Sequence, residues 1–105
     1  MLVQTDKKDK IAVITVNRPD ALNAMNFDVI SELTHAITLA VADSDIGVIV
    51  LTGAGKKAFV AGADIKVMQK FDKEGAKEFG KLGHTLASAI ENSPKPVIAA
   101  VNGFA

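Results

Sequence analysis

Apolar residues follow two different spacings along this chain, and the alternation between them restricts the fold more than any other feature. Ile11–Val16, residues 47–51 and residues 97–101 are short aliphatic runs of strand length. Between the first two runs the spacing becomes helical and is carried by Phe27, Ile30, Leu33, Ile37 and Val41. Asn26 is placed to cap that helix. Strands that alternate with helices predict an α/β fold built from successive strand-turn-helix units.

The predicted strands differ in their surroundings. The first run should pair with residues 2–5 across a charged turn at residues 6–10, and Pro19 should end it because proline donates no ladder hydrogen bond. Residues 47–51 show no polar alternation, which is typical of a strand buried on both faces of a parallel or mixed sheet. A second long helix is expected over residues 73–92.

Composition argues against several classes of function. The chain has 105 residues, of which 49% are hydrophobic, enough for one core or for part of a larger domain. Its twelve basic and twelve acidic side chains cancel, so no broad field favours nucleic acid or an anionic membrane. Without cysteine, and with two histidines, no metal site is expected. The N-terminus lacks an apolar signal segment, so we expect a cytoplasmic protein.

The segment between the second strand and the second long helix is the candidate for chemistry. Ala61, Gly62 and Ala63 have no reactive side chain, but residues this small let a ligand approach the backbone closely. If a short helix begins at Asp64, the amides of residues 62–65 are unpaired donors that suit an anion or a developing oxyanion. The simpler interpretation is a tight connection in which Asp64 only caps the helix, and loop statistics favour it for the segment alone.

A glycine motif in residues 53–58 offers a rival interpretation. It follows a strand, fits the GxGxx(G/A) pattern of dinucleotide-binding turns and has Asp72 downstream. Such a turn should open a helix, whereas residues 57–62 read as extended and end in a glycine. We therefore retain a dinucleotide-binding oxidoreductase fragment only as a remote alternative. A P-loop is excluded because Lys57 stands where serine or threonine is required.

Three sequence blocks resemble the signatures of one family. KAFVAGADI with a lysine after it, at residues 57–66, and PKPVIAAVNG, at residues 94–103, are similar to the paired signatures of the enoyl-CoA hydratase/isomerase (crotonase) family. NRPDALNAMN, at residues 17–26, is a third match in the right order. The resemblance implies the crotonase-like (ClpP/crotonase) fold, with residues 1–105 as the N-terminal part of a single domain whose C-terminal remainder is absent.

Members of this family bind acyl-CoA so that two backbone N–H groups hold the thioester oxygen and stabilise an enolate-like anion. By resemblance, Ala63 supplies the first donor and Lys66 lies near the CoA phosphates. Asp20 stands where some relatives carry a CoA-contacting lysine, so affinity should lean on Lys56, Lys57 or Lys66. The residues expected to contact substrate and CoA are Ala21, Leu22, Ala24, Ala61, Gly62, Ala63, Asp64, Ile65 and Lys66. CoA is part of the substrate, so no separate cofactor is expected.

The resemblance also implies a reaction and an assembly. The reaction is hydration of 2-trans-enoyl-CoA, in fatty acid or related acyl-CoA metabolism, and the assembly is a homo-oligomer, trimeric or hexameric in the family. The family's acid and base carboxylates, and its second N–H donor, follow a segment that residues 101–105 resemble. We therefore expect the isolated chain to be inactive as a hydratase. The alternative is an inactive truncated or split module that acts in assembly or binding.

Overall fold

The N-terminal hairpin joins two strands across a two-residue turn. β1 (Val3–Lys8) pairs antiparallel with β2 (Ile11–Val16). The predicted turn is longer than the observed one, because β1 runs through most of the charged residues and only Asp9 and Lys10 turn. Both have positive φ angles, of 52° and 68°, as a tight hairpin turn of type I′ requires. Charged side chains suit β1 because they protect an edge strand from pairing with other chains.

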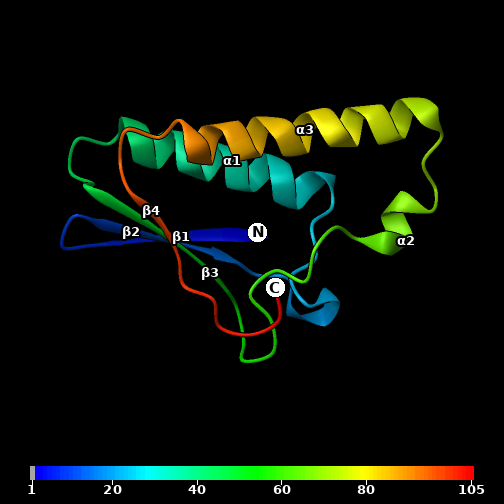
Figure 1. The fold of residues 1–105 in the computed structure, drawn as a ribbon. Helices are drawn as coiled ribbons and strands as arrows, with labels where there is room; N and C mark the ends of the chain where they lie inside the picture. The colour runs from blue at the N-terminus through cyan, green and yellow to red at the C-terminus, as the bar shows by residue number, and fades with distance from the viewer. Residues whose placement is uncertain (1) are drawn as a thin grey trace.

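The computed structural model, which describes residues 2–105, extends this hairpin into a four-stranded sheet in the order β1-β2-β3-β4. β3 (Val48–Gly53) is parallel to β2, and β4 (Val97–Ala99) is parallel to β3. α1 (Phe27–Ala42) connects β2 to β3, while α2 and α3 lie between β3 and β4 (Figure 1). A mixed sheet with helical crossovers confirms the predicted α/β class.

The two long helices begin at side chains that cap them. Asn26 Oδ1 accepts a hydrogen bond from the Val29 N–H at 2.9 Å, which confirms the predicted cap of α1. α3 (Lys73–Glu91) agrees with the second predicted helix to within one residue and is capped by Asp72, whose Oδ1 accepts from the Gly75 N–H at 2.8 Å. Among residues 2–105, no helix is both long and apolar enough to cross a bilayer.

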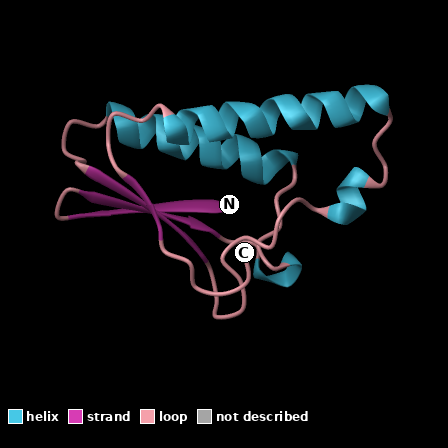
Figure 2. Cartoon of the chain, in the orientation of Figure 1, coloured by secondary structure: helices cyan, strands magenta, loops and turns pink. Residues whose placement is uncertain are grey.

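α1 and α3 cover the same face of the sheet (Figure 2). β2, β3 and β4 follow one another in a single direction across the sheet. Right-handed crossovers then place every connecting helix on the same side. The core between the helices and the sheet includes Ile14, Val29, Ile37 and Ile49, all fully buried.

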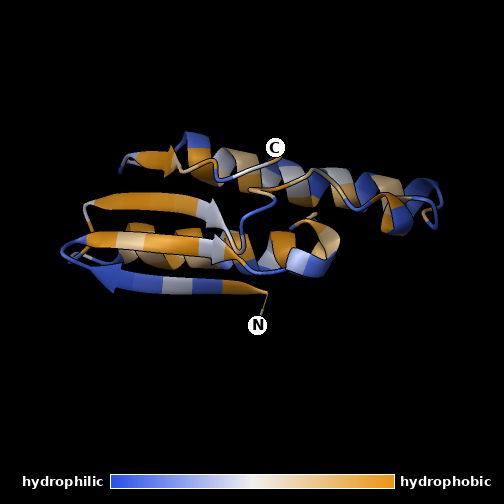
Figure 3. Ribbon diagram, turned by 90° about the horizontal axis from the view of Figure 1, so that it is seen from below, coloured by the Kyte–Doolittle hydropathy of each residue, from blue (hydrophilic) through white to orange (hydrophobic). Residues whose placement is uncertain are grey.

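The opposite face of the sheet is open, which corrects the prediction that β3 is buried on both faces. Ile49 and Leu51 are buried, whereas Val48 and Val50 on the other face of β3 are only half-buried. Within residues 2–105 no helix covers that face, because both crossovers lie on the other side. Figure 3, seen from the side away from the helices, shows β2 and β3 as mostly hydrophobic and β1 as mostly hydrophilic.

Candidate functional site

Two segments that lie far apart in the sequence form the walls of one groove. The first wall contains the 3₁₀ helix Pro19–Ala21 and continues to Ala24, and the second runs from residue 61 into α2 (Ile65–Met68). The groove has a volume of about 440 Å³ and is lined by Arg18, Asp20, Ala21, Leu22, Ala24, Ala61, Ala63, Asp64, Ile65 and Lys66. Every residue predicted to contact the ligand lines it except Gly62. The structure thus brings these residues together, while their role in binding stays a prediction.

A short backbone ladder joins the walls and orients the Ala63 N–H. The Met25 N–H donates to the Gly62 carbonyl at 2.8 Å, and the Asp64 N–H donates to the Met25 carbonyl at 2.8 Å. The C=O and N–H of a trans peptide point in opposite directions, so the Gly62 carbonyl that binds Met25 turns the Ala63 N–H away from it. Within residues 2–105 no acceptor receives a hydrogen bond from that N–H. Ala63 therefore presents an available backbone donor.

Gly62 is needed for its backbone conformation rather than for space. Its φ angle is +115°, which residues with a side chain rarely adopt, and a Cβ added there would meet no heavy atom within 4 Å. Ala61 and Ala63 on either side of it are exposed. Gly62 therefore shapes the turn that presents the Ala63 N–H without itself lining the groove.

The short helix predicted after this turn forms as the four-residue α2. Asp64 caps it, because its Oδ1 accepts from the N–H groups of Lys66 at 3.0 Å and Val67 at 3.3 Å. Capping by Asp64 and an available Ala63 N–H therefore occur together, although the two interpretations drawn from the sequence set them against each other. A helix this short sums few peptide dipoles, so its dipole adds little to the donor that the Ala63 N–H offers.

An ion pair joins the two walls. Arg18 Nη1 lies 2.8 Å from Asp64 Oδ2 and also donates to the Ala24 carbonyl at 2.9 Å. The Arg18 and Asp64 side chains are 23% and 11% exposed, so the pair is partly shielded from water. The hydrogen bond from Arg18 holds the pKa of Asp64 below its ordinary value; burial opposes this shift, and N–H groups of Val67 and Lys66 add to it.

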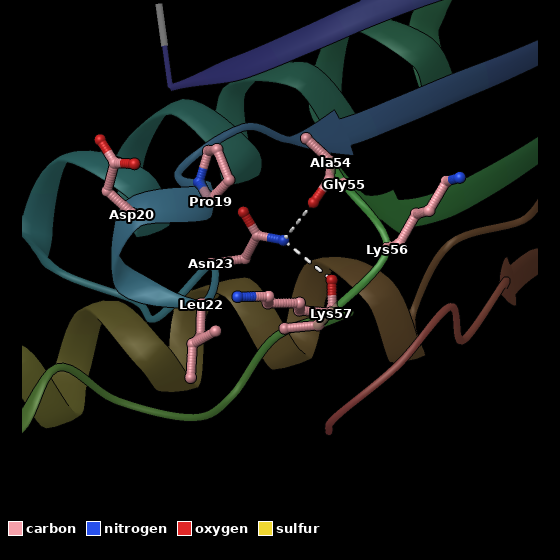
Figure 4. A pocket seen from close by; sticks show the side chains of 9 residues that line it. Pro19, Asp20, Leu22, Asn23, Ala54, Gly55, Lys56 and Lys57 are labelled. Carbon is pink, nitrogen blue, oxygen red and sulfur yellow. Dashed lines mark hydrogen bonds between the residues drawn. The ribbon is translucent and has the colours of Figure 1, made fainter.

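Asn23 ties the first wall to the loop that leads into the second. Its side chain is 1% exposed, and its Oδ1 accepts from the Arg18 N–H at 2.8 Å. Its Nδ2 donates to the carbonyls of Ala54 at 3.0 Å and Ala58 at 2.9 Å (Figure 4). The amide can be buried because each of its polar atoms has a hydrogen-bond partner.

Asn102 binds the same loop from the far end of the sheet. Its Oδ1 accepts from the Gly53 N–H at 3.1 Å, and its Nδ2 donates to the carbonyls of Gly53 at 2.8 Å and Ala58 at 3.2 Å. The Ala58 carbonyl thus accepts from both Asn23 and Asn102. These bonds hold Asn102 against the loop, so the segment after Ala99 turns toward it. β4 therefore ends at Ala99 rather than at residue 101 as predicted.

Two glycines, one at the end of β3 and one in the segment after β4, let the backbone approach this loop closely. A Cβ on Gly53 would lie 2.2 Å from the Phe59 carbonyl oxygen, and a Cβ on Gly103 would lie 2.3 Å from the Lys57 carbonyl oxygen. Neither position can accept a side chain without movement of the backbone opposite it. Glycine at these two positions is therefore a packing requirement.

Sequence reasoning assigned no role to Arg18, Asn23 or Asn102. All three lie inside the blocks that carry the family resemblance. Nothing local marks them, because their partners Asp64 and Ala58 are distant in the sequence. A search for polar residues within those blocks would have found them as candidates without showing what they contact.

A second hollow adjoins the groove and shares Asp20 and Leu22 with it. Its volume is about 310 Å³, and it is lined by Pro19, Asp20, Leu22, Asn23, Ala54, Gly55, Lys56, Lys57 and Ala58 (Figure 4). Lys56 and Lys57 point in opposite directions, with Lys57 on the side of Leu22. Of the three lysines predicted to support CoA binding, Lys66 lines the groove, while Lys56 and Lys57 lie beside it.

The dinucleotide-binding turn considered from the sequence does not form. No helix opens within residues 54–63, and the first helix after β3 is the four-residue α2. Asp72, which the rival interpretation places on a ribose, caps α3 instead. Within residues 2–105, no group of three or more His, Cys, Asp or Glu side chains is placed to hold a metal ion.

Comparison with protein families and curated sequences gives consistent matches. The family model described as Enoyl-CoA hydratase/isomerase matches residues 6–105. The chain is 48% identical over 100 residues to a crotonyl-CoA hydratase of Syntrophomonas wolfei, covering 95% of this chain. It is also 48% identical over 100 residues to a short-chain-enoyl-CoA hydratase of Clostridium acetobutylicum, again over 95% of this chain. It spans 38% of the length of each of these relatives.

Solved structures give the same result. An enoyl-CoA hydratase from Bacillus anthracis superposes with a TM-score of 0.94 at 32% identity, over 98% of this chain and 40% of that one. An enoyl-CoA hydratase from Thermoplasma volcanium superposes with a TM-score of 0.92 at 38% identity, over 98% of this chain and 41% of that one. The strand-turn-helix arrangement is therefore that of the crotonase fold.

Proposed function

Because the chain belongs to the enoyl-CoA hydratase/isomerase family, we propose that its groove binds an acyl-CoA thioester and that the Ala63 N–H donates to the thioester oxygen. The observation that carries this proposal is the backbone ladder from Met25, which leaves the Ala63 N–H without a protein acceptor among residues 2–105. Small exposed residues flank this donor, so a ligand can reach it.

The donor matters most when charge develops on the thioester oxygen. Removal of a proton from the adjacent carbon, or addition of water to a conjugated double bond, moves negative charge onto that oxygen. A fixed N–H therefore binds the transition state more strongly than the ground state. Removing one donor from an oxyanion hole raises the activation barrier by about 2.7–4 kcal/mol.

We propose hydration of 2-trans-enoyl-CoA as the reaction of the whole protein, supported by the names of the hydratase relatives. In this proposal, residues 2–105 bind the ligand and supply one of the two donors to the thioester oxygen. The acid and base carboxylates and the second donor would come from residues that follow the VNGFA segment in the family. Of the carboxylates lining the groove, Asp64 is held by Arg18, which suits it to structure rather than to proton transfer.

Binding of a conjugated enoyl-CoA to the 105-residue chain tests the proposal. We expect crotonyl-CoA to bind and the Ala63 backbone amide to shift in NMR spectra, with no loss of the conjugated thioester absorbance. Ala63→Pro, which removes the N–H, should weaken binding about three- to tenfold, as expected for one hydrogen bond. Ala63→Ser keeps the N–H and serves as the matched control. Equal affinity of both variants and the parent would refute the role of Ala63.

The same experiment distinguishes the second candidate, an inactive module that acts only in assembly. The face of β2 and β3 turned away from the helices is apolar and only half-buried, with Ile11 exposed, which supports association of this chain with other copies. A chain that self-associates but shows no crotonyl-CoA binding at any concentration below its solubility limit would favour this second candidate.

A further inference from the structure

Arg18 connects residues on both sides of the ladder that orients the Ala63 N–H. We propose that Arg18 is a positioning residue: it holds the two walls in the register at which the Ala63 N–H meets a thioester oxygen. The inference rests on the proposed function of the groove. It assigns a role to a groove-lining side chain to which that function gives none.

The positions of the two hydrogen bonds carry the argument. One goes to the carbonyl of Ala24, the residue before Met25, and the other goes to the carboxylate of Asp64, the residue after Ala63. Met25 and Ala63 are the opposite partners of the β-bridge. A single guanidinium therefore binds a neighbour of each partner, so any shift of one wall along the other must break at least one of its bonds.

The ladder needs this support because few other contacts fix it. Two backbone hydrogen bonds form the bridge itself, and one more joins the Ala61 N–H to the Leu22 carbonyl at 3.1 Å. Gly62, directly before Ala63, can adopt a wide range of backbone angles. Because Gly62 does not fix the backbone before Ala63, the orientation of the Ala63 N–H depends on how firmly the next residue, Asp64, is held. The side chain of Asp64 is held by Arg18, which lies outside the ladder.

Arg18 is itself held firmly. Its backbone N–H donates to Asn23 Oδ1 at 2.8 Å, and its carbonyl accepts from the Asn23 N–H at 2.9 Å. Asp64 is anchored as well, since its other oxygen caps α2 through Lys66 and Val67. The ion pair thus links two rigid ends, which is the arrangement in which a charge-assisted hydrogen bond transmits position rather than adapting to movement.

Two variants separate positioning from folding and from direct charge attraction. Asp64→Asn keeps Oδ1 for the α2 cap and removes the carboxylate that binds Arg18. Arg18→Gln removes the guanidinium. Lys70→Gln is the matched control, because it removes one positive charge from an exposed residue just after α2 that lies outside the groove.

The measurement is the affinity of each variant for crotonyl-CoA and for free CoA, which lacks the thioester. Positioning predicts that Arg18→Gln and Asp64→Asn each weaken crotonyl-CoA binding by about threefold, and by no more than Ala63→Pro does. It predicts much less effect on free CoA, and a changed NMR shift of the Ala63 amide in the unliganded variants. The double variant should resemble each single variant, because both remove the same link.

Two results would overturn the inference. Equal losses for crotonyl-CoA and free CoA in Arg18→Gln, without loss in Asp64→Asn, would make Arg18 a direct contact for an anionic ligand. Unchanged affinities in both variants would show that the ladder needs no external support. If Arg18→Gln does not fold, Asp64→Asn decides alone. Failure of the parent chain to bind either ligand would instead refute the proposed function.

Discussion

Gly53→Ala should destabilise the chain, whereas the same substitution at Gly80 should stabilise it. Gly53 ends β3 where the loop from Ala54 to Phe59 folds back over it. Gly80 lies within α3, and a Cβ added there would meet no heavy atom within 4 Å. The two substitutions add the same methyl group, so their difference reports the packing at Gly53 and not the chemistry of the change.

The magnitude follows from three distances. A Cβ on Gly53 would lie 2.2 Å from the Phe59 carbonyl oxygen, 2.6 Å from the Ala58 carbonyl oxygen and 2.7 Å from Asn23 Nδ2. Relieving the shortest contact to an ordinary carbon–oxygen separation needs a movement of about 1 Å. We expect about 1–3 kcal/mol for overpacking and a comparable cost for a strained or broken bond of the buried Asn23 amide. The two costs together come to about 2–6 kcal/mol.

Urea unfolding of the two variants and the parent, followed by circular dichroism, measures this difference. The midpoint for Gly53→Ala should fall by about 2 M with an unchanged slope. The midpoint for Gly80→Ala should rise, because alanine is favoured over glycine in a helix by about 0.5–1 kcal/mol. A Gly53→Ala variant within about 0.5 kcal/mol of the parent would refute the argument. So would equal destabilisation by both substitutions.

Two further predictions concern charged groups. Lys95 Nζ donates to the carbonyls of Ala40 at 2.8 Å and Asp43 at 2.6 Å. Lys95→Met should therefore lower the free energy of unfolding, measured in urea, by about 1–2 kcal/mol. Lys81→Met, at an exposed lysine, is the control and should leave the free energy of unfolding unchanged. The pKa values of Asp43 and Asp64 are both lowered in the folded chain. The stability that these two carboxylates contribute is therefore fully present above the pKa of the unfolded chain, at about pH 4. It is lost as pH falls through the lower pKa of the folded chain. Acid titration should show stability falling below that pH, less steeply for Asp64→Asn, and an equal slope in that variant would contradict the assignment.

Local patterns predicted the elements whose formation depends on neighbouring residues. The spacing from Phe27 to Val41 gave α1, and Asn26 was identified as its cap because N-cap preference is a local effect. The length of the hairpin turn was overestimated. A two-residue turn at Asp9 and Lys10 needs positive φ angles at both residues, and the pair lacks the glycine that usually signals such a turn. Burial of β3 on both faces is not seen within residues 2–105, because burial there depends on where the crossovers place the helices.

The sequence alone determined the α/β class, the family, and a set of predicted contact residues that all line one groove except Gly62. These follow from periodicity and from motifs whose residues are adjacent. Only the tertiary structure decided which N–H is left without an acceptor, and that Arg18 joins Ala24 to Asp64 across the groove. The reason is physical: hydrogen bonds of this kind form between groups brought together by the sheet, and no spacing along the chain encodes their direction.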